Sequence, residues 1–97
     1  MSSYEFEFDT KKNLVLKEKR GISFEEVILL ISEGCLLDVV QHPNTQKYPK
    51  QFIYVVDVSG YVYLVPFVQK GKKIFLKTIY PSRKATKEYL NKGNQNE

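Results

Sequence analysis

The chain has 97 residues, 42% of them hydrophobic and 27% charged, which suits a single globular domain over residues 1–90 followed by a flexible polar tail over 91–97. One cysteine and one histidine exclude an internal disulfide and a zinc site, so neither a metal nor a cofactor is expected. No apolar run reaches the roughly 18 residues of a membrane helix, and the N-terminus does not resemble a signal peptide, which predicts a cytoplasmic protein without membrane contact.

The N-terminal segment has the pattern of a strand and then a helix. Residues 4–8 alternate apolar and acidic side chains, which is the period of a strand with one buried face. Asp9 or Thr10 can cap a helix, because a short side-chain oxygen accepts hydrogen bonds from the free N–H groups of the first turn. That helix is expected to end at Gly21, a residue suited to a left-handed cap.

A second helix is predicted to begin at Ser23 and to stop at Gly34. Ser23 and Glu26 have the spacing of a capping box, and an apolar run follows them. We expect the buried face of this helix to hold Phe24, Val27, Ile28 and Ile31.

From residue 35 onward the pattern is that of strands. Cys35 opens an apolar run over 35–41 and is expected to be a small buried hydrophobe. Residues 42–50 form a polar loop, and two aromatic and β-branched runs then flank Ser59 and Gly60, which predicts a tight hairpin of two central strands. Pro66 cannot donate to a ladder, so it indicates a bulge or an edge.

The C-terminal part predicts a last strand over residues 74–80 and a helix that begins at Pro81 and covers 82–90. The expected order is therefore β-α-α-β-β-β-β-α. This order is typical of an α+β domain with a mostly antiparallel sheet.

Two basic blocks dominate the charge distribution, and the formal net charge is +4. The first lies within residues 11–20, and the second runs from Lys70 to Lys92. Such clustering favours a polyanion or an acidic protein as the partner, although lysines also serve solubility alone.

Two short motifs resemble those of a known toxin family. They consist of Phe8-Asp9, Lys12, Leu16, Lys19-Arg20-Gly21 and Phe24 near one end, and of Arg83-Lys84-Ala85-Thr86 with Glu88 and Tyr89 near the other. At these spacings the chain resembles the BrnT-type toxins of bacterial type II toxin–antitoxin systems, which share the RelE-like fold. Phe8, Leu16 and Arg20 stand where the family has Trp, Asn and His, and an arginine stays protonated at any working pH.

The resemblance implies a RelE-like fold, with the two N-terminal-half helices packed on the sheet. It also implies a toxin that cleaves mRNA without a metal and inhibits translation. A cognate antitoxin, often a ribbon-helix-helix or helix-turn-helix DNA-binding protein, would hold it inactive.

Metal-free RNA cleavage needs a proton acceptor, a cation for the phosphoryl oxygens and a donor for the leaving oxygen. Arg83 is the first candidate, because its planar fork matches two phosphate oxygens and it lies near a helix start; the alternative is a surface salt bridge to Glu88 or Glu25. Lys77 is the second, because in a strand it would share a face with Phe75 and Ile79. Lys19 and Arg20 complete the catalytic candidates.

The RNA-binding candidates are Lys12, Lys84, Tyr80, Tyr48 and His42. Lys12 shares one side of the first helix with Lys19 and Arg20, and the alternative there is a solvated helix face. Tyrosines stack on bases but in strands more often pack, and a loop histidine is more often merely solvated. Two functions stay open: an endoribonuclease toxin, and a non-catalytic protein- or nucleic-acid-binding module of the same fold.

Overall fold

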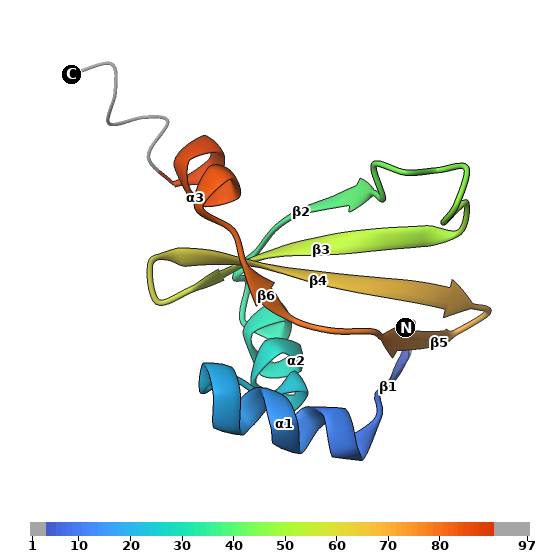
Figure 1. Cartoon of the computed structure of the whole chain (residues 1–97), viewed down its shortest axis with the longest axis horizontal. Helices are drawn as coiled ribbons and strands as arrows, with labels where there is room; N and C mark the ends of the chain where they lie inside the picture. Colours follow the sequence, from blue (N-terminus) through green and yellow to red (C-terminus); the bar gives the residue numbers. More distant parts are fainter. Residues whose placement is uncertain (1–3, 91–97) are drawn as a thin grey trace.

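The structure, a computed structural model, describes residues 4–90. These residues form three helices and a mixed sheet, which confirms the predicted α+β class (Figure 1). In chain order the elements are β1 (Glu5–Glu7), α1 (Thr10–Arg20), α2 (Phe24–Ser32), β2 (Leu36–Gln41), β3 (Gln51–Val58), β4 (Tyr61–Lys70), β5 (Lys73–Leu76), β6 (Tyr80–Pro81) and α3 (Arg83–Tyr89). The tail expected over residues 91–97, and Lys92 with it, lies outside the described residues.

The sheet has the strand order β1-β5-β4-β3-β2, and β6 pairs with β4 beyond the end of β5. All pairs are antiparallel except β1 with β5, which run parallel. The parallel pair places the N-terminal strand at one edge of the sheet, beside a strand from the C-terminal half of the chain. None of the helices in residues 4–90 combines the length and the apolar character needed to cross a bilayer.

Local capping signals place both N-terminal helices as predicted. Asp9 is the N-cap of α1 and accepts from the backbone N–H groups of Lys11 and Lys12, at 2.8 and 3.0 Å. Gly21 follows α1 with φ 68°, a left-handed conformation that glycine adopts without strain. Ser23 is the N-cap of α2 and its Oγ accepts from the Glu26 N–H at 3.1 Å.

The β3–β4 hairpin is confirmed around its two-residue turn. Ser59 and Gly60 have φ of 54° and 91°, and positive φ at both positions matches the twist of the flanking strands. Asp57 Oδ1 accepts from the Gly60 N–H at 2.9 Å and closes the turn. The two strands lie in the centre of the sheet, as expected for runs that are apolar on both faces.

Pro66 lies opposite Ile53 inside the sheet, and it interrupts the ladder on the other side of β4. Its carbonyl accepts from the Lys77 N–H at 2.8 Å, but it has no N–H to return. The chain leaves the ladder there, so the single strand expected over residues 74–80 is wrong: β5 ends at Leu76 and β6 begins at Tyr80. Leu76 and Ile79 both pack into the same apolar cluster, whereas residues three apart in a continuous strand would point to opposite faces of the sheet.

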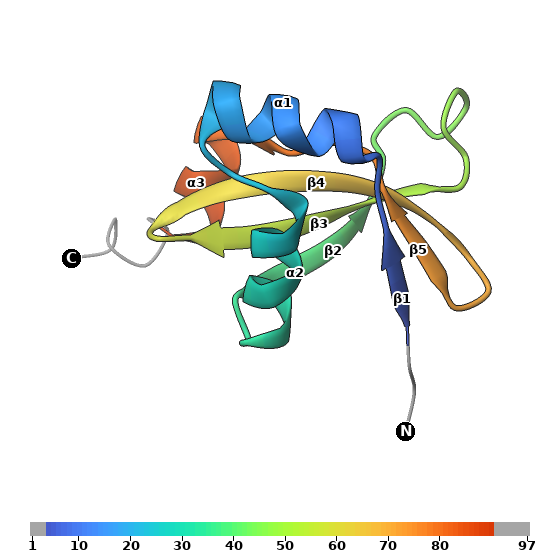
Figure 2. The same cartoon turned by 90° about the horizontal axis from the view of Figure 1, so that it is seen from below.

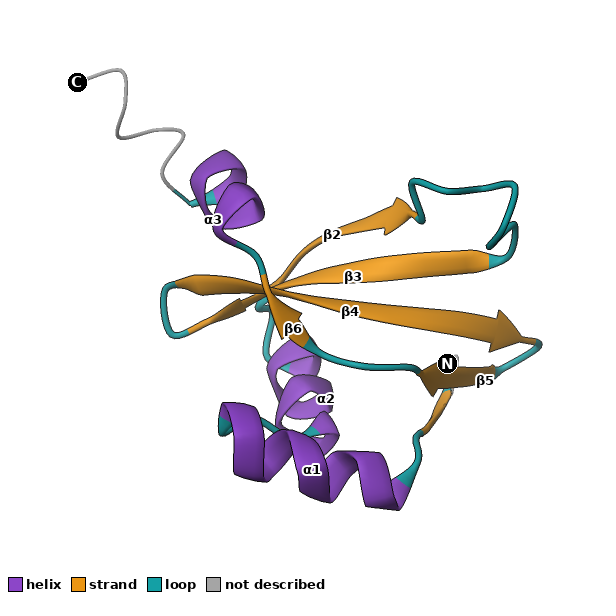
Figure 3. Ribbon diagram, viewed as in Figure 1, coloured by secondary structure: helices purple, strands orange, loops and turns teal. Residues whose placement is uncertain are grey.

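Two apolar clusters lie on opposite faces of the sheet, one under α1 and α2 and one under α3 (Figure 3). The first contains Phe24 and Val27, both 0% exposed, whereas Ile28 and Ile31 are half-buried at its margin. Cys35 is likewise half-buried, not fully buried as expected. The reason is that α2 covers only part of this face of the sheet.

The C-terminal helix starts later than predicted. Pro81 belongs to β6, and Ser82 is the N-cap, with its Oγ accepting from the Ala85 N–H at 3.0 Å. Thr86 attaches α3 to the sheet, because its buried Oγ1 accepts from the Val62 N–H at 2.9 Å.

Asn13 joins the two N-terminal helices and was not singled out by the sequence pattern. Its side chain is 4% exposed; Oδ1 accepts from the Phe24 N–H at 2.7 Å, and Nδ2 donates to Glu25 Oε1 at 2.8 Å. The bond from Asn13 lowers the pKa of Glu25 below its ordinary value. One buried amide therefore links α1 to the first turn of α2.

Asn13→Ala should lower the free energy of unfolding by about 1–3 kcal/mol, because a buried Phe24 N–H would lose its acceptor. Urea melts followed by circular dichroism measure the change, with exposed Gln46→Ala as control. Equal stability of the two variants would show that water replaces the amide at no cost.

Candidate functional site

A hollow beside α1 gathers three of the cations that the sequence singled out. Its volume is about 240 Å³, and its lining consists of Lys12, Val15, Leu16, Lys19, Arg20 and Thr78. We call it the α1 hollow. Its second wall is the connector between β5 and β6, which runs alongside α1 in both views (Figures 1 and 2).

The helical repeat places the cations. Lys19 and Arg20 follow Lys12 by seven and eight residues, which returns them to the same side of α1 after two turns. Leu16 is 5% exposed and anchors the inner side of the helix in the core. The predicted shared face of Lys12, Lys19 and Arg20 is thus present, and it borders a hollow instead of open solvent.

Arg20 fixes the second wall of the α1 hollow. Its Nη1 donates to the Ile79 carbonyl in the stretch where the chain has left the ladder. This contact uses one guanidinium N–H and leaves the others for a ligand. The guanidinium of Arg20 can still make a bidentate contact with an anion, since its N–H groups point in more than one direction.

The electrostatic character of the α1 hollow is purely positive. Its lining carries three cations and the Thr78 hydroxyl, and no Asp, Glu or His of the described residues is among it. Three cations without a carboxylate suit a phosphate, which accepts charge-assisted hydrogen bonds from each of them. The site can hold an anion and stabilise negative charge, but its side chains offer no ready proton acceptor.

Arg83 does not line the α1 hollow. It is the first residue of α3 and is exposed, and the nearby Ala85 N–H is taken by Ser82. The salt bridge to Glu88 or Glu25 that the sequence left open is not formed, since the ion pair found within residues 4–90 joins Lys73 to Glu7, at 3.7 Å.

Lys77 lies in the connector, and it shares a face with Phe75 as predicted but not with the buried Ile79, because the strand is broken there. Its side chain is exposed, with Nζ 5.6 Å from the centre of the Phe75 ring. Tyr80 is half-buried in β6, where it pairs with Leu64. Lys77 and Tyr80 therefore flank Thr78 along the chain without lining the α1 hollow themselves.

His42 and Tyr48 contact each other at the loop between β2 and β3, with ring centroids 4.5 Å apart. His42 Nδ1 accepts from the Asn44 N–H at 3.1 Å, so one ring nitrogen is occupied. Neither ring lines the α1 hollow. The structure thus separates these two RNA-binding candidates from the cations on α1.

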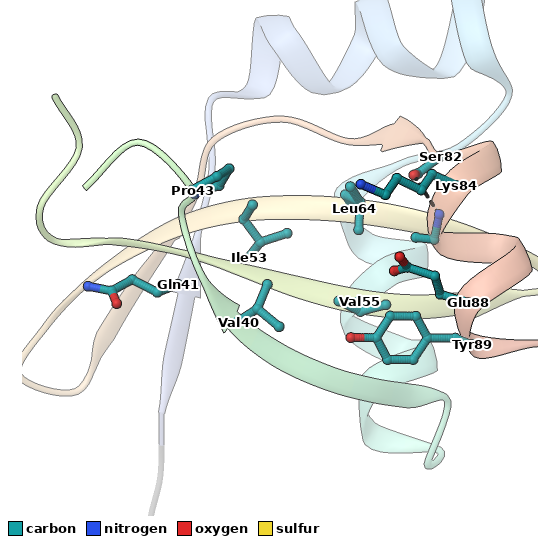
Figure 4. Close-up of a pocket in the computed structure, with 11 residues that line it drawn as sticks. Val40, Gln41, Pro43, Ile53, Val55, Leu64, Ser82, Lys84, Glu88 and Tyr89 are labelled. Atoms are coloured by element: carbon teal, nitrogen blue, oxygen red, sulfur yellow. Dashed lines mark hydrogen bonds between the residues drawn. The ribbon is translucent and has the colours of Figure 1, made fainter. Parts of the chain in front are cut away.

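A second hollow lies between α3 and the sheet, and we call it the α3 hollow (Figure 4). It has a volume of about 420 Å³ and contains Lys84 among the predicted residues. The whole lining consists of Val40, Gln41, Pro43, Ile53, Val55, Leu64, Ser82, Lys84, Ala85, Glu88 and Tyr89. Sequence reasoning missed this hollow, because its floor comes from three strands and its rim from a distant helix.

A third hollow lies on the part of the sheet that α2 leaves uncovered. Its volume is about 660 Å³, and Tyr4, Phe6, Tyr54 and Phe67 give it an aromatic lining. Tyr54 and Phe67 stack with centroids 4.0 Å apart and are themselves buried, so they form its floor.

Within residues 4–90, no three His, Cys, Asp or Glu side chains come close enough together to hold a metal ion. No family model, curated protein or solved structure matches this chain, so its function is inferred from its own residues and geometry.

Proposed function

We propose that this protein binds single-stranded RNA through the α1 hollow and acts as the toxin of a type II toxin–antitoxin system. In this proposal it is a metal-independent endoribonuclease of the cytoplasm that cleaves mRNA and so inhibits translation. The observation that carries the RNA part is the convergence of Lys12, Lys19 and Arg20 on one hollow without a carboxylate. The cleavage part rests on the resemblance of the two motifs to BrnT-type toxins.

Cleavage would use the 2′-hydroxyl of the RNA as nucleophile, with the scissile phosphate in the α1 hollow. Arg20 and Lys12 would stabilise the charge that grows on the phosphoryl oxygens. The 2′-hydroxyl would give its proton to water as its oxygen bonds to phosphorus and the bond from phosphorus to the leaving oxygen breaks. The Lys19 ammonium would protonate the leaving oxygen, and the Thr78 hydroxyl would donate a further hydrogen bond.

A non-catalytic RNA-binding module of the same fold is the second candidate. One observation favours it: Arg20 cannot accept a proton, and no carboxylate or imidazole of the described residues lines the α1 hollow to accept one instead. Such a module would bind the same RNA and leave it intact.

Incubation with RNA in EDTA separates the two candidates. We expect cleavage that EDTA leaves unchanged and that ends in 2′,3′-cyclic phosphates, the product of 2′-hydroxyl attack. Tight binding of RNA that stays intact would establish the non-catalytic module. No binding of RNA at physiological salt would refute both.

The antitoxin partner belongs to the same proposal. An acidic segment of a ribbon-helix-helix or helix-turn-helix protein would fit the positive α1 hollow and exclude RNA from it. In this proposal the antitoxin inhibits the toxin simply because it occupies the hollow in which RNA would bind.

Arg83→Ala should lower the rate of RNA cleavage while the free energy of unfolding stays within about 0.5 kcal/mol of the parent, because Arg83 is exposed and unpaired in residues 4–90. We assign Arg83 a phosphate next to the one in the α1 hollow. Arg83→Lys should restore only part of the rate, since a point charge cannot make a paired contact. Lys87→Ala on the same helix is the control, and cleavage by Arg83→Ala at the parental rate would make Arg83 an ordinary surface residue.

A further inference from the structure

The α3 hollow combines an apolar floor with a rim of polar and charged side chains. Strands β2, β3 and β4 supply Val40, Ile53, Val55 and Leu64 to the floor. Figure 4 shows Leu64 and Val55 next to the side chains of α3, with Ile53 and Val40 farther from the helix. A volume of about 420 Å³ lies within the range of small-molecule sites, about 300–1,000 Å³. The floor suits one flat, mostly apolar group.

We propose that the α3 hollow binds a guanine base of the single-stranded RNA whose phosphate lies in the α1 hollow. This inference rests on the proposed RNA binding and adds to it a second subsite with a base preference. It does not depend on whether the RNA is cleaved.

Tyr89 provides an aromatic wall that is held in place. Its hydroxyl donates to Asp38 Oδ2 at 2.7 Å, and the residue remains 36% exposed beside the hollow. This hydrogen bond and partial burial raise the pKa of Tyr89 above its ordinary value. An oriented, accessible ring is what an unstacked nucleobase needs as a stacking partner.

Lys84 and Glu88 set the hydrogen-bonding preference. They are one helical turn apart on α3 and both line the hollow, yet no ion pair joins them in the described structure. The Watson–Crick edge of guanine places an acceptor oxygen next to two N–H donors, which matches an ammonium beside a carboxylate. Adenine presents a lone pair at N1, where guanine has its first donor, and uracil presents one at O2, where guanine has its second donor. The Glu88 carboxylate would repel either lone pair.

The chain itself connects the two hollows. Thr78 lines the α1 hollow and Ser82 lines the α3 hollow, four residues later. Four extended residues span at most about 14 Å. The two hollows lie on opposite faces of the sheet, so a strand of RNA that occupies both must pass round the sheet edge at β6. The exposed Arg83 follows Ser82 in the chain and adds a cation next to the α3 hollow.

The test uses 2′-O-methyl RNA of about six nucleotides, which cannot be cleaved because the nucleophilic hydroxyl is blocked. The strands are all-uridine, or uridine with one guanosine, inosine or adenosine. We expect the guanosine strand to bind about tenfold more tightly than the adenosine and all-uridine strands. The inosine strand should fall between them, because inosine lacks the second donor. Amide signals of Val40, Leu64 and Ala85 should shift with guanosine only.

Two variants locate the preference. Glu88→Gln should bind the guanosine and all-uridine strands equally, while Glu33→Gln, which removes the same charge from the exposed end of α2, should keep the tenfold difference. Val40→Phe fills the floor of the hollow with a strand-forming residue and should also abolish the difference. Thermal melts confirm that both variants are folded.

Equal binding of all strands to the parent protein, or a preference that survives in Glu88→Gln, would overturn the guanine site and leave the proposed RNA binding intact. Binding of no strand at all would refute the proposed function and the guanine site together. Shifts confined to Tyr54 and Phe67 would assign the base to the aromatic hollow and equally overturn the inference.

Discussion

Replacing Lys12, Lys19 and Arg20 together by alanine should abolish RNA cleavage and weaken RNA binding by about tenfold for each phosphate that no longer meets a cation. These three side chains are the only cations that line the α1 hollow among the described residues. Each substitution also removes a cation that would displace a counterion from the RNA on binding. The slope of log binding constant against log salt should therefore fall in magnitude by about 2, from three phosphates at roughly 0.7 each on a single strand.

Fluorescence anisotropy with labelled RNA at several salt concentrations measures both quantities. The control triple variant replaces Lys70, Lys72 and Lys73 at the β4–β5 turn, which removes the same charge from a surface outside the α1 hollow. If both triple variants lose affinity equally, net charge alone attracts RNA and the α1 hollow is not a site. Circular dichroism must show a folded protein, because Arg20 also bonds to the Ile79 carbonyl.

Phe24→Ala should have the largest effect on stability, about 3–5 kcal/mol. Phe24 is 0% exposed and its ring stacks on Phe8 with centroids 5.0 Å apart. Truncation leaves a cavity between α2 and the sheet that the strands cannot close without losing their register. Since a domain of this kind has about 5–15 kcal/mol in total, the variant should be close to unfolding at room temperature.

Guanidinium melts give the free energy of unfolding of this variant, with Leu29→Ala as control. Leu29 lies on the same helix but is 56% exposed, so its truncation should cost no more than about 0.5 kcal/mol. A loss below about 1 kcal/mol for Phe24→Ala would show that α2 is not fixed to the sheet through this ring.

The three cations of the α1 hollow could be grouped from the sequence, because the helical repeat fixes which residues share a side of a helix. Seven- and eight-residue spacings within one helix give neighbouring side chains whatever the rest of the chain does, so the shared face of Lys12, Lys19 and Arg20 needed only the prediction of α1. Thr78 could not be added in this way. It reaches the hollow through the contact of Arg20 with Ile79, which are 59 residues apart.

Lys77 illustrates the opposite case. It was placed from the pattern of an uninterrupted strand, and Pro66 on the neighbouring strand interrupts that strand. A proline alters the hydrogen bonding of the strand beside it. The residues around position 77 contain no sign of this effect, because the proline lies on another strand. The same break separates β5 from β6, and the cap at Ser82 sets the helix start at Arg83 instead of Pro81. Arg83 does lie at a helix start, as predicted.

By itself the sequence determined the features that depend on neighbours within a few residues. These are the caps at Asp9 and Ser23, the turn at Ser59 and Gly60, and the buried side of α2 at Phe24 and Val27. Only the tertiary structure decided the parallel pairing of β1 with β5, the α1–α2 bridge by Asn13 and the three hollows. Helix caps and turns form from hydrogen bonds inside one segment, whereas a hollow is the space left when separate segments pack, so its lining depends on contacts that no single stretch of sequence contains.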